Sequence, residues 1–145
     1  AIQMATDRLN ELSGGLQVQL KEELNRKISE IICRITGGKY TRLLVEEDLH
    51  MSLLSEGKRI PMEQASRGTI EQIYFSLRMT ASKVLQEEEN PVILDDTFVY
   101  YDDERLKHTL AWLAENKKQV LIFTCQKREI QLLEELGLDY HKVCL

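Results

Sequence analysis

The sequence predicts an α/β fold, namely a mostly parallel sheet with flanking helices, a small antiparallel meander and an N-terminal amphipathic helix. Two observations predict it. From residue 66 onward, stretches with helical periodicity alternate with short apolar runs, and this order implies parallel strands joined by right-handed crossovers. The run Val92 to Leu94 ends in the paired carboxylates Asp95 and Asp96, which is typical of a buried strand that carries charge to the C-terminal edge of an open sheet.

Residues 1–35 form the first element, an amphipathic helix expected from about residue 4 to 35. Its other face is charged, so it is either the base of a coiled coil or a helix packed on its own domain. Ser13-Gly14-Gly15 predicts a kink or break, and Gly37 and Gly38 predict the end of the helix. The apolar positions that recur at steps of three and four are Leu9, Leu12, Leu16, Leu20, Leu24, Ile28, Ile31 and Ile35.

The next elements are extended. Residues 40–46 and 50–54 predict two strands, and a turn at 55–58 leads to a third extended segment at 59–61, which together make an antiparallel meander. Helical periodicity returns over residues 66–86, with Ser66 as the expected N-cap.

Asn90-Pro91 ends that helix and introduces the strand at 92–94. A helix from about 102 to 116, a strand at 119–124, a helix near 128–136 and a last short strand at 140–144 complete the expected order. Gly137 is expected to stop the last helix.

The composition limits which kinds of protein the chain can be. The chain has 145 residues, 43% of them hydrophobic and 30% charged, which suits one ordinary globular domain. A net charge of −5 gives no overall attraction to nucleic acid or to an anionic membrane. Three cysteines without a CxxC pair favour a reducing, cytoplasmic compartment, and no apolar run is long enough for a membrane span. The chain starts at Ala1 without Met, within a helical pattern, so we expect it to be a piece of a longer protein.

Two groups of residues suggest chemistry. Asp95 and Asp96 suit one Mg²⁺ ligand and one group that orients water, although an acidic turn would also explain them. Residues 66–69 place a hydroxyl, a glycine and free N–H groups at a helix start that attracts phosphate, although a simple cap is the alternative. The pairs Lys117-Lys118 and Lys127-Arg128 could touch DNA, but solvated charge is the simpler interpretation.

Together these motifs resemble the C-terminal lobe of an ABC-type ATPase head, a P-loop NTPase. Within that superfamily the chain is most similar to the SMC-like branch of chromosome maintenance and DNA repair, and in particular to the bacterial YhaN-like AAA-family ATPases. The similarity covers most of residues 35–130 and is carried by the runs 35–42 and 66–78, by Asp95-Asp96, by Asp102 and by Gln126 followed by Glu129.

The resemblance implies roles at the strand ends. Asp95 matches the Walker B aspartate that holds Mg²⁺. Asp96 stands where the general base of the family polarises the attacking water, commonly as Glu. Gln126 occupies the position of the switch histidine, and its neutral amide can donate to the γ-phosphate but cannot carry imidazolium charge. We therefore expect Asp96 and Gln126 to be catalytic. Because Asp96 stands in place of the common Glu and Gln126 in place of the switch histidine, the rate of ATP hydrolysis is in question.

The resemblance also implies a site in trans. Ser66 and Gly68 match the signature loop that grips the γ-phosphate of ATP bound to the opposing subunit, with Arg67 and Thr69 beside it. Asp102 matches the D-loop residue that communicates across the dimer. The string Leu12 to Gly15 spells the signature letters but lies too far before Asp95 to serve.

The expected domains are a coiled-coil base at 1–35 and an ATPase lobe at 36–145. No GxxxxGK[ST] loop occurs, so the fragment alone should be inactive and need the N-terminal lobe of the same polypeptide. The family further implies ATP and Mg²⁺ as ligands, a head-head homodimer, DNA, and a metallophosphoesterase nuclease as partner. The alternatives are a non-hydrolysing, ATP-dependent assembly module and a receiver-like phosphoacceptor.

Overall fold

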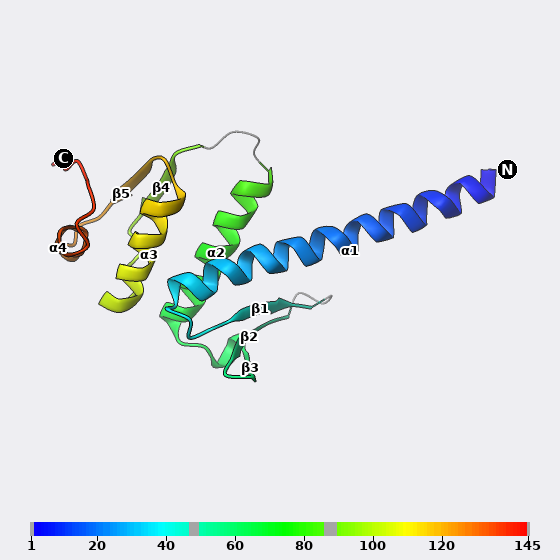
Figure 1. Cartoon of the computed structure of the whole chain (residues 1–145), viewed down its shortest axis with the longest axis horizontal. Helices are drawn as coiled ribbons and strands as arrows, with labels where there is room; N and C mark the ends of the chain where they lie inside the picture. The colour runs from blue at the N-terminus through cyan, green and yellow to red at the C-terminus, as the bar shows by residue number, and fades with distance from the viewer. Residues whose placement is uncertain (1, 47–49, 86–89, 145) are drawn as a thin grey trace.

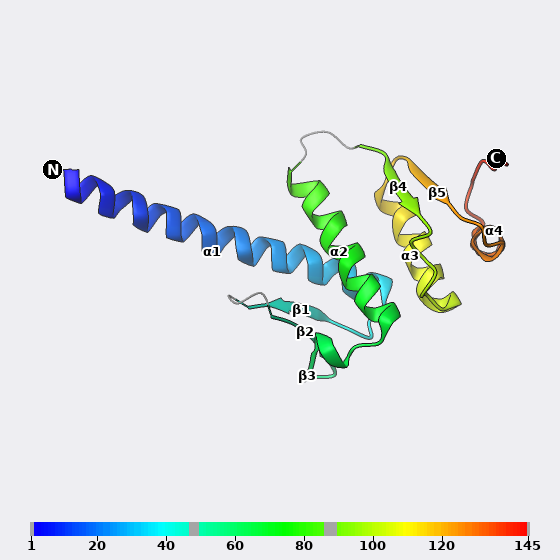
Figure 2. The same ribbon diagram turned by 180° about the vertical axis from the view of Figure 1, so that it is seen from behind.

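A long helix projects from an α/β body that contains all the other elements (Figure 1). The computed structural model describes residues 2–46, 50–85 and 90–144, with the backbone alone for residues 2–17 and 85. The N-terminus lies at the far tip of α1 (Ile2–Ile35), and the C-terminus lies at the opposite end of the molecule, beside α4 (Arg128–Glu135) (Figure 2). The α/β class is as predicted.

Helix α1 runs without interruption through residues 13–15, so the predicted kink or break there is wrong. Two glycines cost about 2 kcal/mol of helix propensity, which a helix of 34 residues can absorb. Val18 and Leu20 are 57% and 51% exposed, so the described apolar stripe is uncovered before it reaches the body. At the other end Gly37 has φ +60°, and the Gly38 amide donates to the Cys33 carbonyl at 2.8 Å, which closes the helix as predicted.

The predicted meander is confirmed. Strands β1 (Arg42–Val45), β2 (Met51–Ser55) and β3 (Lys58–Pro61) form an antiparallel sheet in that order. Leu43 pairs with Leu53, and both are fully buried. A two-residue turn joins β2 to β3, with positive φ at Glu56 and Gly57.

Helices α2 (Arg67–Leu85) and α3 (Asp103–Asn116) pack with α1 around the core. Phe75 of α2 meets Trp112 of α3 edge to face, with ring centroids 5.9 Å apart. The buried Gln72 side chain donates to the Ile35 carbonyl at 2.7 Å, which satisfies one orphan acceptor at the end of α1. The body is therefore anchored on the last turns of α1.

The second sheet is a parallel pair of β4 (Val92–Asp95) and β5 (Val120–Phe123), followed by α4 (Arg128–Glu135). Val92 and Leu94 are buried, but the alternate positions face outward, with Ile93 67%, Phe123 43% and Leu121 38% exposed. The predicted buried strand is therefore buried on one face only, because no described element covers the other face.

The predicted last strand is absent, since residues 140–144 have no strand pairing within the described part of the chain. The Tyr140 hydroxyl instead donates to Glu134 at 2.8 Å. A mostly parallel sheet is thus confirmed only for the pair β4–β5. None of the described helices combines the length and hydrophobicity needed to cross a bilayer.

Candidate functional site

The paired carboxylates lie where β4 ends. Asp95 is the last residue of the strand and is in register with Phe123, and the Asp96 amide donates to the Phe123 carbonyl at 3.0 Å. Both side chains are exposed, and no described residue gives either one a hydrogen bond or ion pair. Two unpaired carboxylates fit Mg²⁺, which binds one or two such ligands together with substrate phosphates. Among the described residues, no group of three or more His, Cys, Asp or Glu is placed so that it could hold a metal ion by itself.

Asp96 has an unusual backbone, with φ +45°. Asp and Asn enter this left-handed region more readily than longer side chains, because their short polar groups can bond locally. This conformation gives a physical reason for Asp rather than Glu at this position. It also turns the chain sharply at the end of β4.

The segment after β5 emerges at the same sheet edge, because β4 and β5 are parallel. The Gln126 amide donates to Thr124 Oγ1 at 3.0 Å, which forms a turn before α4. Gln126 is half-buried, and its side-chain amide makes no hydrogen bond with a described residue. Gln126 therefore follows β5, the strand that pairs with β4, and β4 ends in Asp95.

Ser66 caps α2 as predicted. Its Oγ accepts from the Thr69 amide at 3.3 Å and lies 2.9 Å from Thr69 Oγ1. Ser66 and Arg67 are exposed, whereas Gly68 and Thr69 are buried. The exposed half of the predicted phosphate loop is therefore Ser66-Arg67. The buried Thr69 holds the Ser66 side chain through the two contacts with its Oγ.

Gly68 permits a close approach between α2 and the loop 96–102. A Cβ at this position would lie 2.6 Å from the Tyr100 carbonyl oxygen and 3.1 Å from Arg105 Nη1. Beside it the Arg67 guanidinium lies over the Tyr100 ring, 4.2 Å from the centroid. The start of α2 and the loop are packed as one unit.

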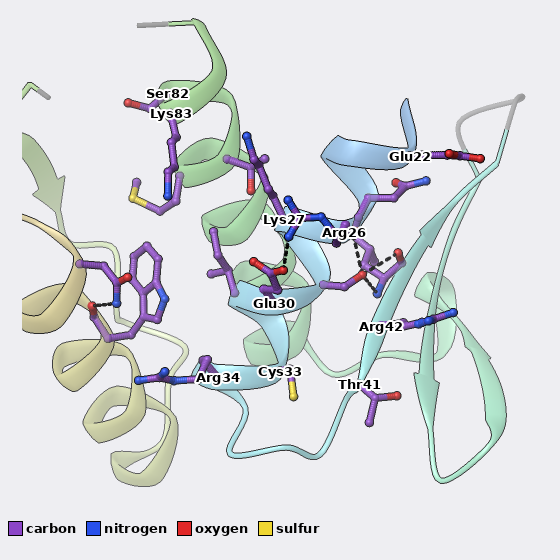
Figure 3. Close-up of a pocket in the computed structure, with 18 of the residues that line it drawn as sticks. Glu22, Arg26, Lys27, Glu30, Cys33, Arg34, Thr41, Arg42, Ser82 and Lys83 are labelled. Atoms are coloured by element: carbon purple, nitrogen blue, oxygen red, sulfur yellow. Dashed lines mark hydrogen bonds and ion pairs between the residues drawn. The ribbon is translucent and has the colours of Figure 1, made fainter. Parts of the chain in front are cut away.

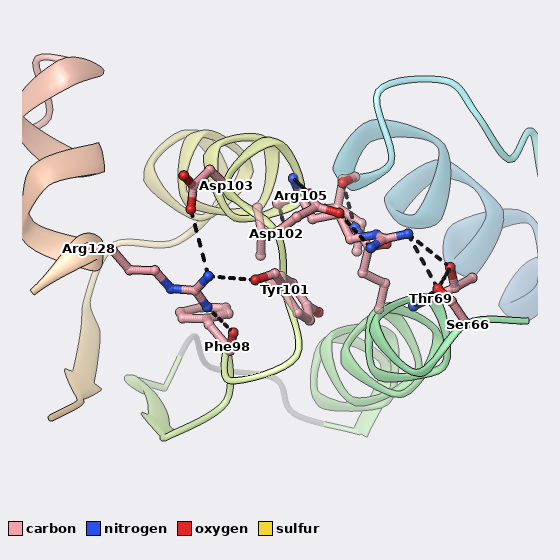
Figure 4. A network of polar contacts seen from close by, with 11 residues as sticks. Ser66, Thr69, Phe98, Tyr101, Asp102, Asp103, Arg105 and Arg128 are labelled. Carbon is pink, nitrogen blue, oxygen red and sulfur yellow. Dashed lines mark hydrogen bonds and ion pairs between the residues drawn. The ribbon is translucent and has the colours of Figure 1, made fainter. Parts of the chain in front are cut away.

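Asp102 caps α3 and accepts two bonds from Arg105, from the backbone amide at 2.8 Å and from Nη1 at 2.6 Å. Arg105 Nη2 also lies 3.4 Å from both Ser66 Oγ and Thr69 Oγ1 (Figure 4). Arg105 thus joins Asp102 to the cap of α2. Sequence reasoning missed Arg105, and the one available signal was its spacing of three residues from Asp102.

Sequence reasoning also missed Arg128. The interpretation of the pair Lys127-Arg128 as solvated charge is wrong for Arg128. The Arg128 side chain is 26% exposed and donates to the carbonyls of Phe98 and Tyr101 (Figure 4). Lys127 is exposed. A basic pair at a helix start gives no sequence signal that distinguishes an inward from an outward Arg.

Tyr101 anchors the loop in the core, and its ionisation gives a prediction. Burial raises the pKa of its phenol well above the ordinary value of 10.0, and no described residue gives the hydroxyl a partner. The folded state therefore favours the neutral phenol, so stability is unaffected below pH 10 and is lost as pH rises above it. We expect Tyr101→Phe to be at least as stable as the wild type at neutral pH, because it removes a buried hydroxyl without a described partner, and its advantage to grow at alkaline pH. Urea titrations at several pH values measure this, and parallel pH profiles for the two proteins would contradict it.

An open groove of about 1340 Å³ lies elsewhere, along α1 (Figure 3). Residues of α1, β1, α2 and α3 line it, and the loops 95–102 and 124–128 contribute none. Several of its charges are paired, as in Arg26 with Glu30 and Lys27 with Glu23 at 2.8 Å. This groove is separate from the predicted site.

The predicted residues form two groups. Asp95, Asp96 and Gln126 share the edge of the parallel pair, and Ser66 and Asp102 are joined through Arg105. No hydrogen bond or ion pair between the two groups is found among the described residues, and the loop 96–102 connects them in sequence. This arrangement suits two groups that act on different ligands.

The chain is similar to the uncharacterized protein YhaN of Bacillus subtilis (strain 168), with 36% identity over 121 residues. The match covers 77% of this chain but 13% of YhaN, so the chain spans a small part of that relative. No family model matches the chain.

Solved SMC heads share the fold. One, from work on ATP-driven dimerization and DNA-stimulated activation of SMC ATPases, has a TM-score of 0.67 at 17% identity, over 81% of this chain and 76% of its own. The Smc head of Pyrococcus furiosus, bound to the C-terminal domain of ScpA, has a TM-score of 0.66 at 16% identity, over 87% of this chain and 34% of its own. The Smc head of Pyrococcus yayanosii has a TM-score of 0.67 at 12% identity, over 87% of this chain and 26% of its own.

Proposed function

Because this chain is a YhaN-like segment with the fold of the C-terminal lobe of an SMC ATPase head, we propose that it is one half of an ATPase that hydrolyses ATP between two heads. The observation that carries the proposal is the pair of exposed, unpaired carboxylates Asp95 and Asp96 at the end of β4, beside the segment that holds Gln126. Open α/β sheets bind ligands at this edge.

Each residue at the strand ends has a proposed role. Asp95 would hold Mg²⁺, which when bound neutralises charge on the phosphates. Asp96 would accept a proton from, or orient, the attacking water, and Gln126 would donate a hydrogen bond to the γ-phosphate. Ser66 and Arg67, exposed at the start of α2, would contact the ATP of the opposing head. Asp102 would act across the same interface.

The rest of the head must come from outside this chain. The sequence has no GxxxxGK[ST] loop, and Ile93, Leu121 and Phe123 leave one face of β4–β5 exposed. An N-terminal lobe of the same polypeptide would cover this face and supply the phosphate loop. The uncovered apolar side chains Val18 and Leu20 support the proposal that residues 1–35 are the base of a coiled coil.

The wider function is proposed as DNA repair or chromosome maintenance, with a head-head homodimer and a metallophosphoesterase nuclease as partner. These partners follow from the family resemblance.

The second candidate is an assembly module that dimerises on ATP without turnover. Two observations favour it, the neutral Gln126 at the switch position and the short Asp96 on a left-handed backbone. Both functions predict ATP binding and differ only in the release of phosphate.

The test uses the intact protein that contains this chain. We expect ATP-dependent dimerisation by analytical ultracentrifugation, together with phosphate release that stops when EDTA removes Mg²⁺ and when Asp95 is changed to Ala. Dimerisation without release would favour the assembly module. If ATP neither binds nor dimerises the protein, both proposals fail.

A further inference from the structure

Arg128 holds two main-chain carbonyls of the loop 96–102. Its Nη1 donates to the Tyr101 carbonyl at 2.6 Å and its Nη2 to the Phe98 carbonyl at 2.5 Å. The Tyr101 amide donates to the Phe98 carbonyl at 2.9 Å, so the guanidinium closes over both ends of one turn (Figure 4). This bidentate fit uses the planar fork of arginine.

The carboxylates near Arg128 lie farther away. Asp103 Oδ1 is 3.7 Å from Nη1, and Glu129 Oε1 is 3.8 Å from Nε. The short contacts are therefore those to the carbonyls. Because the side chain is only 26% exposed, these charge-assisted hydrogen bonds form in a partly dry setting where they are strong. The main effect of Arg128 is to fix the position of the loop.

The far side of the same loop is held by Arg105. Asp102 directly follows Tyr101 and accepts from Arg105, whose Nη2 reaches Ser66 and Thr69 at 3.4 Å. The Arg105 side chain is 23% exposed. A continuous set of polar contacts thus runs from the start of α4 through the loop to the cap of α2 (Figure 4).

We propose that Arg128 is a positioning residue that couples the segment holding Gln126 to the loop 96–102 and, through Asp102 and Arg105, to Ser66 at the start of α2. Arg128 lies two residues after Gln126, so a shift of this segment moves the guanidinium and the turn that it holds. The functional part rests on the proposed function, in which Gln126 and Ser66 face the two ATP molecules of one dimer. Occupancy of one site would then change the geometry of the other.

The first test needs no nucleotide. Amide hydrogen exchange is followed by mass spectrometry in the intact protein, in peptides that cover residues 97–103. We expect Arg128→Gln to speed exchange about tenfold there, because the turn loses both donors. Lys127→Gln is the matched control, since it removes a neighbouring exposed charge, and it should leave exchange in these peptides unchanged.

The second test adds ATP in the Asp96→Asn background, without DNA. ATP should slow exchange in residues 66–69 and 97–103 of the protein with Arg128, and this protection should be lost in Arg128→Gln although ATP still binds. In the hydrolysing protein, we expect Arg128→Gln to lower kcat about tenfold with KM for ATP unchanged, because binding remains while alignment is lost.

Arg128→Lys covers the case in which Arg128→Gln fails to fold, as shown by circular dichroism. It keeps the charge and most of the stem, but one ammonium does not reproduce the fork, so exchange in 97–103 should stay about threefold faster than in the wild type. Wild-type exchange in whichever Arg128 variant folds would overturn the proposal. If ATP does not bind the intact protein, the proposed function fails, and the first test still decides whether Arg128 positions the loop.

Discussion

Asp96→Asn should abolish most ATP turnover in the intact protein while ATP binding and ATP-dependent dimerisation persist. The expected fall in kcat is about 10²- to 10⁴-fold, the usual contribution of a general base. Asn removes only the charge, because it tolerates the left-handed backbone at φ +45° as readily as Asp does. Phosphate release measured at saturating ATP and Mg²⁺ reports the loss.

Glu104→Gln is the matched control for Asp96→Asn. It removes an exposed carboxylate in the first turn of α3 that makes no hydrogen bond or ion pair with a described residue, so kcat should stay within about twofold of the wild type. A kcat for Asp96→Asn equal to that of the control would show that Asp96 is not the base.

Gly68→Ala should destabilise the protein and disrupt the start of α2. The new Cβ would meet the Tyr100 carbonyl oxygen at 2.6 Å, and both partners belong to packed backbone that has little room to move. We expect a loss of about 1–3 kcal/mol in the free energy of unfolding, the usual cost of overpacking. Urea denaturation measures it. Because Ser66 and Arg67 precede this contact, ATP-dependent dimerisation should weaken as well.

Arg78→Ala provides the comparison on the same helix. Arg78 is exposed, and alanine suits a helix interior, so the change in stability should lie within about 0.5 kcal/mol. Equal stability of Gly68→Ala and Arg78→Ala would mean that the loop 96–102 yields to the added methyl group.

Local pattern predicted most elements of the fold. The helix at 67–85, the meander and the acidic pair after β4 follow from periodicity, turn residues and strand length, and each forms close to its expected bounds. The predicted last strand is wrong because a short extended segment needs a partner strand, and no local signal says whether one is present. The open face of β4–β5 was missed for a similar reason, since Ile93 and Phe123 look like core residues in the sequence.

The sequence predicted where the exposed candidate residues lie on the elements, and it missed the residues that hold them in place. Ser66, Asp95 and Asp102 end or begin elements, where short polar residues have recognisable roles. Arg105 and Arg128 act through contacts with residues 27 to 39 positions away, which no spacing rule anticipates. The burial of Thr69 likewise depends on packing between α2 and the loop 96–102.

The central claim is that this chain is half of an ATPase head, and one measurement tests it most directly. The chain is mixed with the separately expressed N-terminal lobe of the same polypeptide, and phosphate release from ATP is measured with Mg²⁺. We predict release from the mixture and none from either lobe alone. A mixture that forms a stable complex on gel filtration but neither binds nor hydrolyses ATP would contradict the claim.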